Sequence, residues 1–301
     1  MHHDAHVEAL MYTRQHLGYS APSAWPMRQP DAASAEPFTG KQIPVPGGVH
    51  MLGGSPDQAF VMDNEKWETP VDVADFVMDE VPVTQAQFAD FVDDGGYERE
   101  EFWDSEGWEW LAGQDDSHPV YWRKSPGGWE RRVFDTWRPL ESGHPVIHVN
   151  WWEARAYCAW ANRRLPTEAE WERAASYDPS GVKRYSRPWG SDEATQERAA
   201  LDVTPLGTAP VDSCEAGASA LGFRHLLGNV WEWTDSVFEP LPGFTRDSYL
   251  DNSAPWFGSR KVLRGGSWST RSRYVRNTFR NYFTPDRVDI FAGFRTCATD
   301  S

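Results

Sequence analysis

Helical periodicity is confined to a few short stretches of this chain of 301 residues. The first covers residues 1–17, where a polar opening leads into an amphipathic stretch from Ala9 to Leu17 that Gly18 stops. Three further helices are predicted by capping boxes, in which the cap and the third helical residue satisfy each other's backbone N–H groups. These boxes are Thr84-x-x-Gln87, with a stop at Gly95-Gly96, Asn150-x-x-Glu153, with a helix to about Arg163, and Thr167-x-x-Glu170, with a helix to about Ser176.

Short apolar runs between the helices predict strands, and turn residues predict loops. Val146–Val149 and Lys261–Leu263 are strand-like, and Gly265-Gly266 predicts a tight turn that needs positive φ. The stretch 20–46 is rich in proline and indicates a linker. The tract 177–260 shows little periodicity, but its many aromatic residues predict ordered loops packed by their own rings.

Histidines are concentrated at the start of the first predicted helix. His2 and His6 are one turn apart, so both imidazoles leave the same face and could bind one divalent metal ion. A pairing of His3 with His6 is the alternative. Glu8 points elsewhere and is expected to accept a hydrogen bond from a ligand ring N–H. Two imidazoles do not complete a site, so a further ligand has to come from another segment or chain; otherwise this is a solvated, His-rich helix end.

Composition narrows the class of protein. The formal net charge of −16 argues against nucleic acid or an anionic membrane as a partner and suits a cationic ligand. Cys158, Cys214 and Cys297 are too far apart for a disulfide framework. No apolar run approaches the roughly 20 residues that span a bilayer, and no signal peptide is recognisable, so we expect a cytoplasmic protein. The 17 tryptophans can fill a core and can also form a cage for a quaternary ammonium group.

A series of motifs, in a fixed order, resembles one family over roughly residues 40–298. That family comprises the catalytic domain shared by formylglycine-generating enzymes and the non-haem iron sulfoxide synthases of ergothioneine biosynthesis. The resemblance implies an α+β, C-type-lectin-like fold with little regular secondary structure. The motifs are Asp63-Asn-Glu-Lys66, Pro82-Val-Thr84, Asp94-Gly-Gly-Tyr97, Arg164-Leu-Pro-Thr-Glu-Ala-Glu-Trp-Glu172, Pro188-Trp-Gly190, Gly228-Asn-Val-Trp-Glu-Trp-Thr234, Leu263-Arg-Gly-Gly-Ser-Trp268 and Phe291-Ala-Gly-Phe-Arg295.

Two positions separate the branches of this family. Formylglycine-generating enzymes carry a reactive cysteine pair shortly after the Gly-Gly-Ser turn, and the matching positions here are Thr270 and Val275. Neither residue can form a thiolate or bind copper, which argues against that chemistry. Cys297 lies too far toward the C-terminus to replace either.

The ergothioneine branch places a helical bundle before this domain, and the bundle supplies three His ligands to iron. Two of them belong to a His-x-x-x-His-x-Glu motif, which His2, His6 and Glu8 match. The third lies well upstream in that branch, so the resemblance implies an N-terminally truncated chain. The implied organisation is a remnant of the bundle at 1–19, a linker at 20–42 and the catalytic domain at 43–298.

The same branch uses a Phe-Arg-Asn segment to line the pocket for hercynine, the trimethylated histidine betaine. Here the segment reads Phe279-Arg-Asn-Tyr-Phe283, so the resemblance implies that Asn281 contacts the carboxylate region and that Tyr282 faces the ammonium group. Phe283 replaces an Asp that helps one subgroup to hold γ-glutamylcysteine, which argues against that donor.

Three further residues are weaker candidates for the same site. Arg280 and Arg287 could pair with a substrate carboxylate, and the alternative is a structural contact. Tyr249 is a candidate catalytic residue, because one subgroup has a proton- or electron-delivering Tyr in this region; core packing is its alternative.

Three further segments look most like selenoneine synthases, which join hercynine to a selenosugar. They are Thr13-Arg-Gln-His-Leu-Gly-Tyr19, Asn64-Glu-Lys-Trp67 and His118-Pro-Val-Tyr-Trp122. The expected activity is therefore an Fe(II)- and O₂-dependent oxidoreductase reaction that forms a C–S or C–Se bond on hercynine, with a thiol or selenosugar donor. The rivals are a non-catalytic ligand-binding module on the same scaffold and, less favoured, a formylglycine-generating oxidase.

Overall fold

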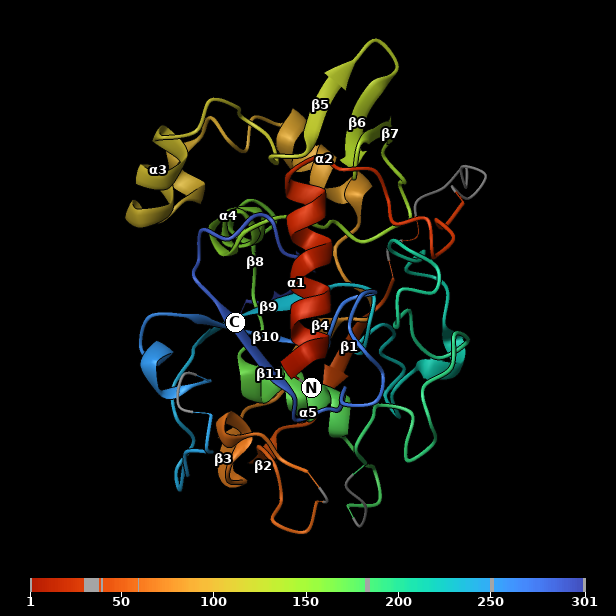
Figure 1. The fold of residues 1–301 in the computed structure, drawn as a ribbon. Helices are drawn as coiled ribbons and strands as arrows, with labels where there is room; N and C mark the ends of the chain where they lie inside the picture. Colours follow the sequence, from red (N-terminus) through yellow and green to blue (C-terminus); the bar gives the residue numbers. More distant parts are fainter. Residues whose placement is uncertain are drawn as a thin grey trace.

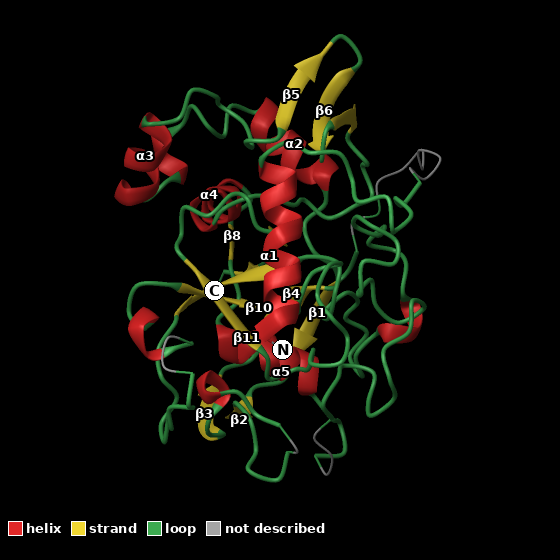
Figure 2. Cartoon of the chain, in the orientation of Figure 1, coloured by secondary structure: helices red, strands yellow, loops and turns green. Residues whose placement is uncertain are grey.

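The computed structural model describes residues 2–29, 38, 40–58, 60–181, 185–249 and 252–299, with His2 described by its backbone alone. Five helices and four small sheets are present in this part of the chain, joined by long loops (Figure 2). The expected α+β architecture with little regular secondary structure is confirmed. The helices are α1 (His2–His16), α2 (Gln85–Asp93), α3 (Ser105–Ala112), α4 (Trp151–Trp160) and α5 (Glu168–Ser176).

Helix boundaries follow the capping signals closely. Thr84, Asn150 and Thr167 each accept a hydrogen bond from the third residue of the helix they cap, and all three predicted capping boxes are formed. Helix α1 ends at His16, and Gly18 adopts a φ of 65° just beyond it. Helix α3 has no capping box, although Asp104 accepts from the N–H of Gly107 at its start.

Two four-stranded sheets form the centre of the fold. One has the order β1-β4-β13-β8 and the other β11-β10-β9-β12, in which β9 pairs antiparallel with β10 and parallel with β12. A hairpin of β2 and β3 and a meander of β5, β6 and β7 complete the set. The strands are β1 (Gln42–Val45), β2 (Gly48–Leu52), β3 (Thr69–Val73), β4 (Phe76–Asp79), β5 (Trp122–Ser125), β6 (Gly128–Val133), β7 (Thr136–Pro139), β8 (Arg163–Arg164), β9 (Trp231–Val237), β10 (Lys261–Arg264), β11 (Arg280–Phe283), β12 (Ala292–Gly293) and β13 (Cys297–Ala298).

The strand predictions had mixed outcomes. Lys261–Leu263 lies within β10, and Gly265 and Gly266 have φ of 94° and 85°, as a tight turn requires. The prediction of a strand at Val146–Val149 is wrong: the segment is buried but unpaired as a strand, because His148 adopts a φ of 65°. The tract 177–260 consists mainly of loops, as predicted, but it contains β9.

Helix α1 packs against the rest of the molecule through one side. In Figure 1 it stands in front of the sheets. Met11 is buried in a cluster with Phe134, Val230 and Phe291, and Gln15 exchanges hydrogen bonds with the backbone of Arg132 and Phe134. None of the described helices is long and apolar enough to cross a membrane.

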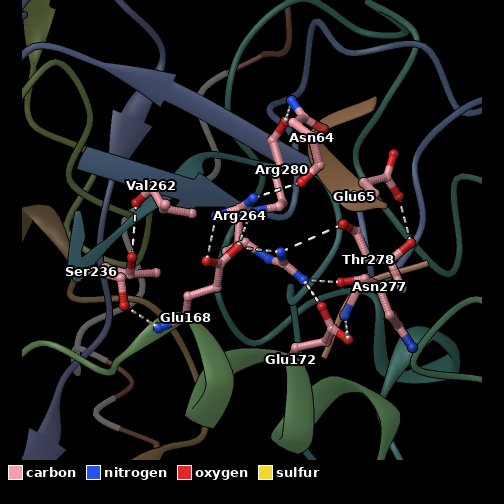
Figure 3. Close-up of polar contacts among 12 residues, drawn as sticks. Asn64, Glu65, Glu168, Glu172, Ser236, Val262, Arg264, Asn277, Thr278 and Arg280 are labelled. Carbon is pink, nitrogen blue, oxygen red and sulfur yellow. Dashed lines mark hydrogen bonds and ion pairs between the residues drawn. The ribbon is translucent and has the colours of Figure 1, made fainter. Parts of the chain in front are cut away.

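A buried ion-pair network joins α5 to the sheet that contains β10 and β11. Arg264, on β10, donates to Glu168 (2.8 Å) and to Glu172 (2.5 Å), and its side chain is fully buried. Arg280, on β11, donates to the same Glu168 through Nε at 2.6 Å and Nη2 at 3.0 Å. Figure 3 shows how the two guanidinium groups converge on α5.

We expect Arg264→Met to lower the free energy of unfolding by about 3–5 kcal/mol, because the substitution leaves Glu172 as a buried carboxylate without its arginine. Urea denaturation of the two proteins measures the difference. The control is Lys124→Ala, which removes the exposed pair of Lys124 with Asp93 and should cost no more than about 1 kcal/mol. Equal losses in the two variants would contradict the role of the network.

Candidate functional site

A pocket of about 260 Å³ lies where α1 faces strand β11. Helix α1 contributes one stripe of side chains and β11 contributes its whole length, while β9, a short 3-10 helix (Asp63–Glu65) and loops supply the rest. The lining residues are Ala5, Glu8, Tyr12, Met62, Asn64, Trp231, Asn252, Tyr274, Phe279, Arg280, Asn281, Tyr282, Phe283 and Ile290.

Aromatic rings form most of the apolar wall of this pocket. Trp231 and Phe279 are tilted against each other with centroids 5.5 Å apart, and Tyr274 meets Phe279 edge to face at 5.2 Å. Tyr282 stacks on Phe238 at 4.0 Å, which fixes the plane of its ring. Rigid ring faces of this kind can receive an organic cation.

Glu8 anchors α1 to strand β9 and to the turn after β10. Its carboxylate accepts hydrogen bonds from Trp231 Nε1 (2.8 Å), Ser267 Oγ (2.6 Å) and Thr270 Oγ1 (2.8 Å). Burial raises the pKa of Glu8 above its ordinary value of 4.5, because the loss of solvation outweighs the three donors. Glu8 was expected to orient a ligand imidazole; its hydrogen bonds run instead to the strand and turn beneath the helix.

Of the two predicted metal ligands, only His6 has a described side chain, and it does not line the pocket. Ala5, Glu8 and Tyr12 follow the helical repeat along the pocket side, whereas His6 is exposed. The backbone of His2 is helical one turn before His6, while the His2 side chain lies outside the described part of the structure. Within the described residues no group of three His, Cys, Asp or Glu side chains could hold a metal ion. These residues alone therefore do not complete an iron site.

Three of the predicted substrate-binding residues lie together in the pocket wall: Arg280, Asn281 and Tyr282. Asn281 Oδ1 accepts from the backbone N–H of Tyr282 at 2.9 Å, so its amide NH₂ is the end that can donate to a ligand. The guanidinium of Arg280 is held by Glu168 and by the backbone oxygens of Asn64 and Glu239. The guanidinium of Arg280 is therefore bound by protein groups behind the pocket wall and is not presented to a substrate as a free cation.

Arg287 and Tyr249 do not line the pocket. Arg287 donates to Asp289 at 2.6 Å and lies over the ring of Phe283, 4.8 Å from its centroid. Tyr249 is 53% exposed. Burial, together with the charges of Asp63 and Tyr249, raises the pKa of Tyr282 to about 12.

Several lining residues were not predicted from the sequence. Asn64 comes from the 3-10 helix Asp63–Glu65 and Asn252 from a loop. Tyr12 and Tyr274 come from α1 and from the segment after the Gly-Gly-Ser turn. The Asp63-Asn-Glu-Lys66 motif contains Asn64, but as a motif it indicates the family and does not single out a site residue. Asn252 lies in an aperiodic loop that carries no signal of its own.

Comparison with known proteins identifies the class to which this fold and pocket belong. The family of sulfatase-modifying factor enzyme 1-like domains matches residues 29–300, so the chain belongs to this family, as the motifs predicted. The structure resembles that of PvdO from Pseudomonas aeruginosa, with a TM-score of 0.59, 20% identity and coverage of 86% of this chain and 94% of that chain. It also resembles CarF, with a TM-score of 0.53 and 20% identity over 87% of this chain and 98% of that one. At these identities the likeness supports the fold alone.

Similar proteins fall in the two branches that the motifs suggested, namely hercynine oxygenases and formylglycine-generating enzymes. The chain is 43% identical over 240 residues to a hercynine oxygenase of Mycobacterium tuberculosis, covering 79% of this chain and 56% of the relative. It is 39% identical over 282 residues to a hercynine oxygenase of Mycolicibacterium thermoresistibile, covering 87% and 63%. A formylglycine-generating enzyme of Streptomyces coelicolor is 31% identical over 318 residues, covering 95% and 97%. The chain thus spans 56% to 63% of the length of these two hercynine oxygenases.

We expect Glu8→Gln to remove a pH dependence of the docking of α1. The folded pKa of Glu8 is raised, so its contribution to stability is fully present below the ordinary value of 4.5 and is lost as the pH rises through the folded pKa. Amide hydrogen exchange of α1, measured at a series of pH values from 4.5 upward and corrected for intrinsic exchange, should show falling protection in the parent relative to the Gln variant. Glu98→Gln, at an exposed position, is the control. Parallel profiles for the parent and Glu8→Gln would contradict this assignment.

Proposed function

We propose that this chain carries the substrate-binding wall of a non-haem iron oxygenase that acts on hercynine and joins it to a sulfur or selenium donor. The observation that carries the proposal is a pocket that combines aromatic ring faces, an Asn281 amide whose oxygen is already occupied, and the helix that carries His6. The similarity to hercynine oxygenases supports hercynine as the substrate. Fe(II) at His2 and His6 and O₂ as the oxidant are part of the proposal.

The residues of the pocket have separable roles toward a betaine. The trimethylammonium group packs on the faces of Trp231, Phe279 and Tyr282, a contact worth about 0.5–2 kcal/mol. The amide NH₂ of Asn281 donates to the carboxylate, which a neutral amide can do without an added charge. The surrounding rings keep water away from the imidazole during reaction. The described side chains do not complete a ligand set for iron.

The residues that stand in place of the cysteine pair of formylglycine-generating enzymes support an activity other than formylglycine generation. Thr270 donates to Glu8 and so takes part in holding α1, and Val275 is buried in an apolar cluster with Trp171. Neither side chain can supply the thiolate that the other branch requires.

The second substrate is proposed to be a selenosugar or a small thiol other than γ-glutamylcysteine. Phe283 lines the pocket at the place where one subgroup has an Asp, so it offers no carboxylate to an incoming ammonium group. Tyr249 stays in the proposal as a candidate catalytic residue, and Arg287 as a candidate partner for a substrate carboxylate. A cytoplasmic location fits these substrates.

We expect the chain to bind hercynine more tightly than histidine, because only the trimethylated ammonium group covers the aromatic faces without losing N–H hydrogen bonds to water. Asn281→Ala should weaken hercynine binding by roughly 1–3 kcal/mol, the range for a lost buried hydrogen bond. Isothermal titration calorimetry of both ligands with both proteins measures this. Equal affinity for hercynine and histidine in the folded chain would refute the aromatic site.

Fe(II) should bind weakly to this chain and through the N-terminal turn of α1, since imidazoles bind metal in their neutral form and only one pair is offered. A His2→Ala, His6→Ala double variant should lose this binding, measured by calorimetry under anaerobic conditions. His16→Ala, at the far end of the same helix, is the matched control and should bind as the parent does. Undiminished binding by the double variant would show that the metal site is elsewhere.

A further inference from the structure

The pocket has an end rich in buried hydrogen-bond acceptors that hercynine does not need. Asn64 lines the pocket and is only 1% exposed. Its Nδ2 donates to the backbone oxygen of Arg280 at 3.5 Å, which fixes the orientation of the amide. Its Oδ1 is buried and receives no hydrogen bond from any described residue. A buried acceptor without a donor is costly, so this atom calls for an explanation.

Asp63, directly before Asn64, also has a buried oxygen that receives no hydrogen bond from the described residues, and here the group is a carboxylate. The residue is fully buried, and its Oδ1 accepts from Asn252 Nδ2 and from Ser253 Oγ, each at 2.6 Å. Its Oδ2 is buried and has no donor in the described part of the chain. No Lys, Arg or His side chain among the described residues forms an ion pair with it. The carboxylate therefore makes this end of the site electronegative.

Asn252 adds a third acceptor at the same place. It lines the pocket, and its Nδ2 donates both to Asp63 and to Ser253 Oγ, the latter at 3.1 Å. With the NH₂ turned toward the protein, the carbonyl oxygen of the amide is the group left for a ligand.

These orientations give the pocket two poles. Asn281 presents an NH₂ donor, whereas Asn64 and Asn252 present oxygen acceptors with the carboxylate of Asp63 behind them. Hercynine has a carboxylate for the first pole but little for the second, because its trimethylammonium group has no N–H and its imidazole offers a single one. The second pole therefore matches another molecule that carries several N–H or O–H groups close together.

We propose that Asn64 and Asn252, with the buried carboxylate of Asp63 behind them, form the subsite for the second substrate and that they select a small molecule with adjacent hydrogen-bond donors. This inference rests on the proposed function, because it assumes that hercynine occupies the aromatic part of the pocket. Two sources share the required chemistry: the neighbouring hydroxyl groups of a sugar and the primary ammonium group of an amino acid. In either case the sulfur or selenium atom extends from the subsite toward the hercynine ring.

The test uses 1-thio-β-D-glucose and L-cysteine as probes, titrated into the folded chain with and without hercynine. Asn64→Ala and Asp63→Asn are the variants; the second is isosteric and keeps the acceptor for Asn252 and Ser253. Asp72→Asn, on the exposed face of β3, is the matched control, and thermal unfolding checks that every variant is folded.

We expect saturable binding of at least one probe, weakened tenfold or more in both variants and unchanged in the control. Hercynine binding should stay within twofold in all of them. Loss of thioglucose binding assigns the subsite to a sugar, and loss of cysteine binding assigns it to an ammonium group.

Probe binding that survives both substitutions, or no probe binding by the parent, would overturn the subsite. Saturable Ca²⁺ binding that Asp63→Asn abolishes would also overturn it, since the oxygens would then belong to a cation. Failure of hercynine alone to bind would instead refute the proposed function.

Discussion

Two carboxylates of one helix hold two arginines of neighbouring strands where no water reaches, and the pocket depends on this arrangement. Glu168 and Glu172 project from α5, and they meet Arg264 of β10 and Arg280 of β11 (Figure 3). Each arginine is nearly or fully buried, so the removal of one partner would leave a charge that the interior cannot solvate. A fold with such short strands needs this kind of cross-link, because its sheets alone offer few backbone hydrogen bonds.

Glu8 gives α1 a comparable anchor on the opposite side of the pocket. Its three donors come from Trp231, Ser267 and Thr270, so the helix is tied both to β9 and to the turn after β10. The resemblance to formylglycine-generating enzymes implies that Thr270 matches one of their reactive cysteines. In this chain the same position holds a helix in place, which illustrates how one scaffold can exchange a chemical group for a structural contact.

Local signals in the sequence predicted the helices well, because a capping box depends on residues three positions apart. The motif at 279–283 also identified Asn281 and Tyr282 as parts of one wall, and both line the pocket. The strand at Val146–Val149 was predicted wrongly because apolar residues are equally suited to a buried loop, and the positive φ of His148 has no sequence signal. Asn64 and Asn252 were missed for a related reason: they are separated by a long stretch of chain and become neighbours only through Asp63. Whether Tyr249 and Arg287 act on a substrate stays a prediction.

The polarity of the pocket follows from Arg280 more than from the asparagines themselves. A side-chain amide can present either end to a ligand, and the partner of the other end decides which one is left. The backbone oxygen of Arg280 binds the NH₂ of Asn64, and its guanidinium holds the backbone oxygen of the same residue, at 2.6 Å. The next residue on the strand is Asn281, whose oxygen is occupied by the following backbone N–H. One buried arginine, fixed by Glu168, therefore orients the acceptor of Asn64, and the strand that continues from it orients the donor of Asn281. The same wall thus offers the two groups that two different substrates would need.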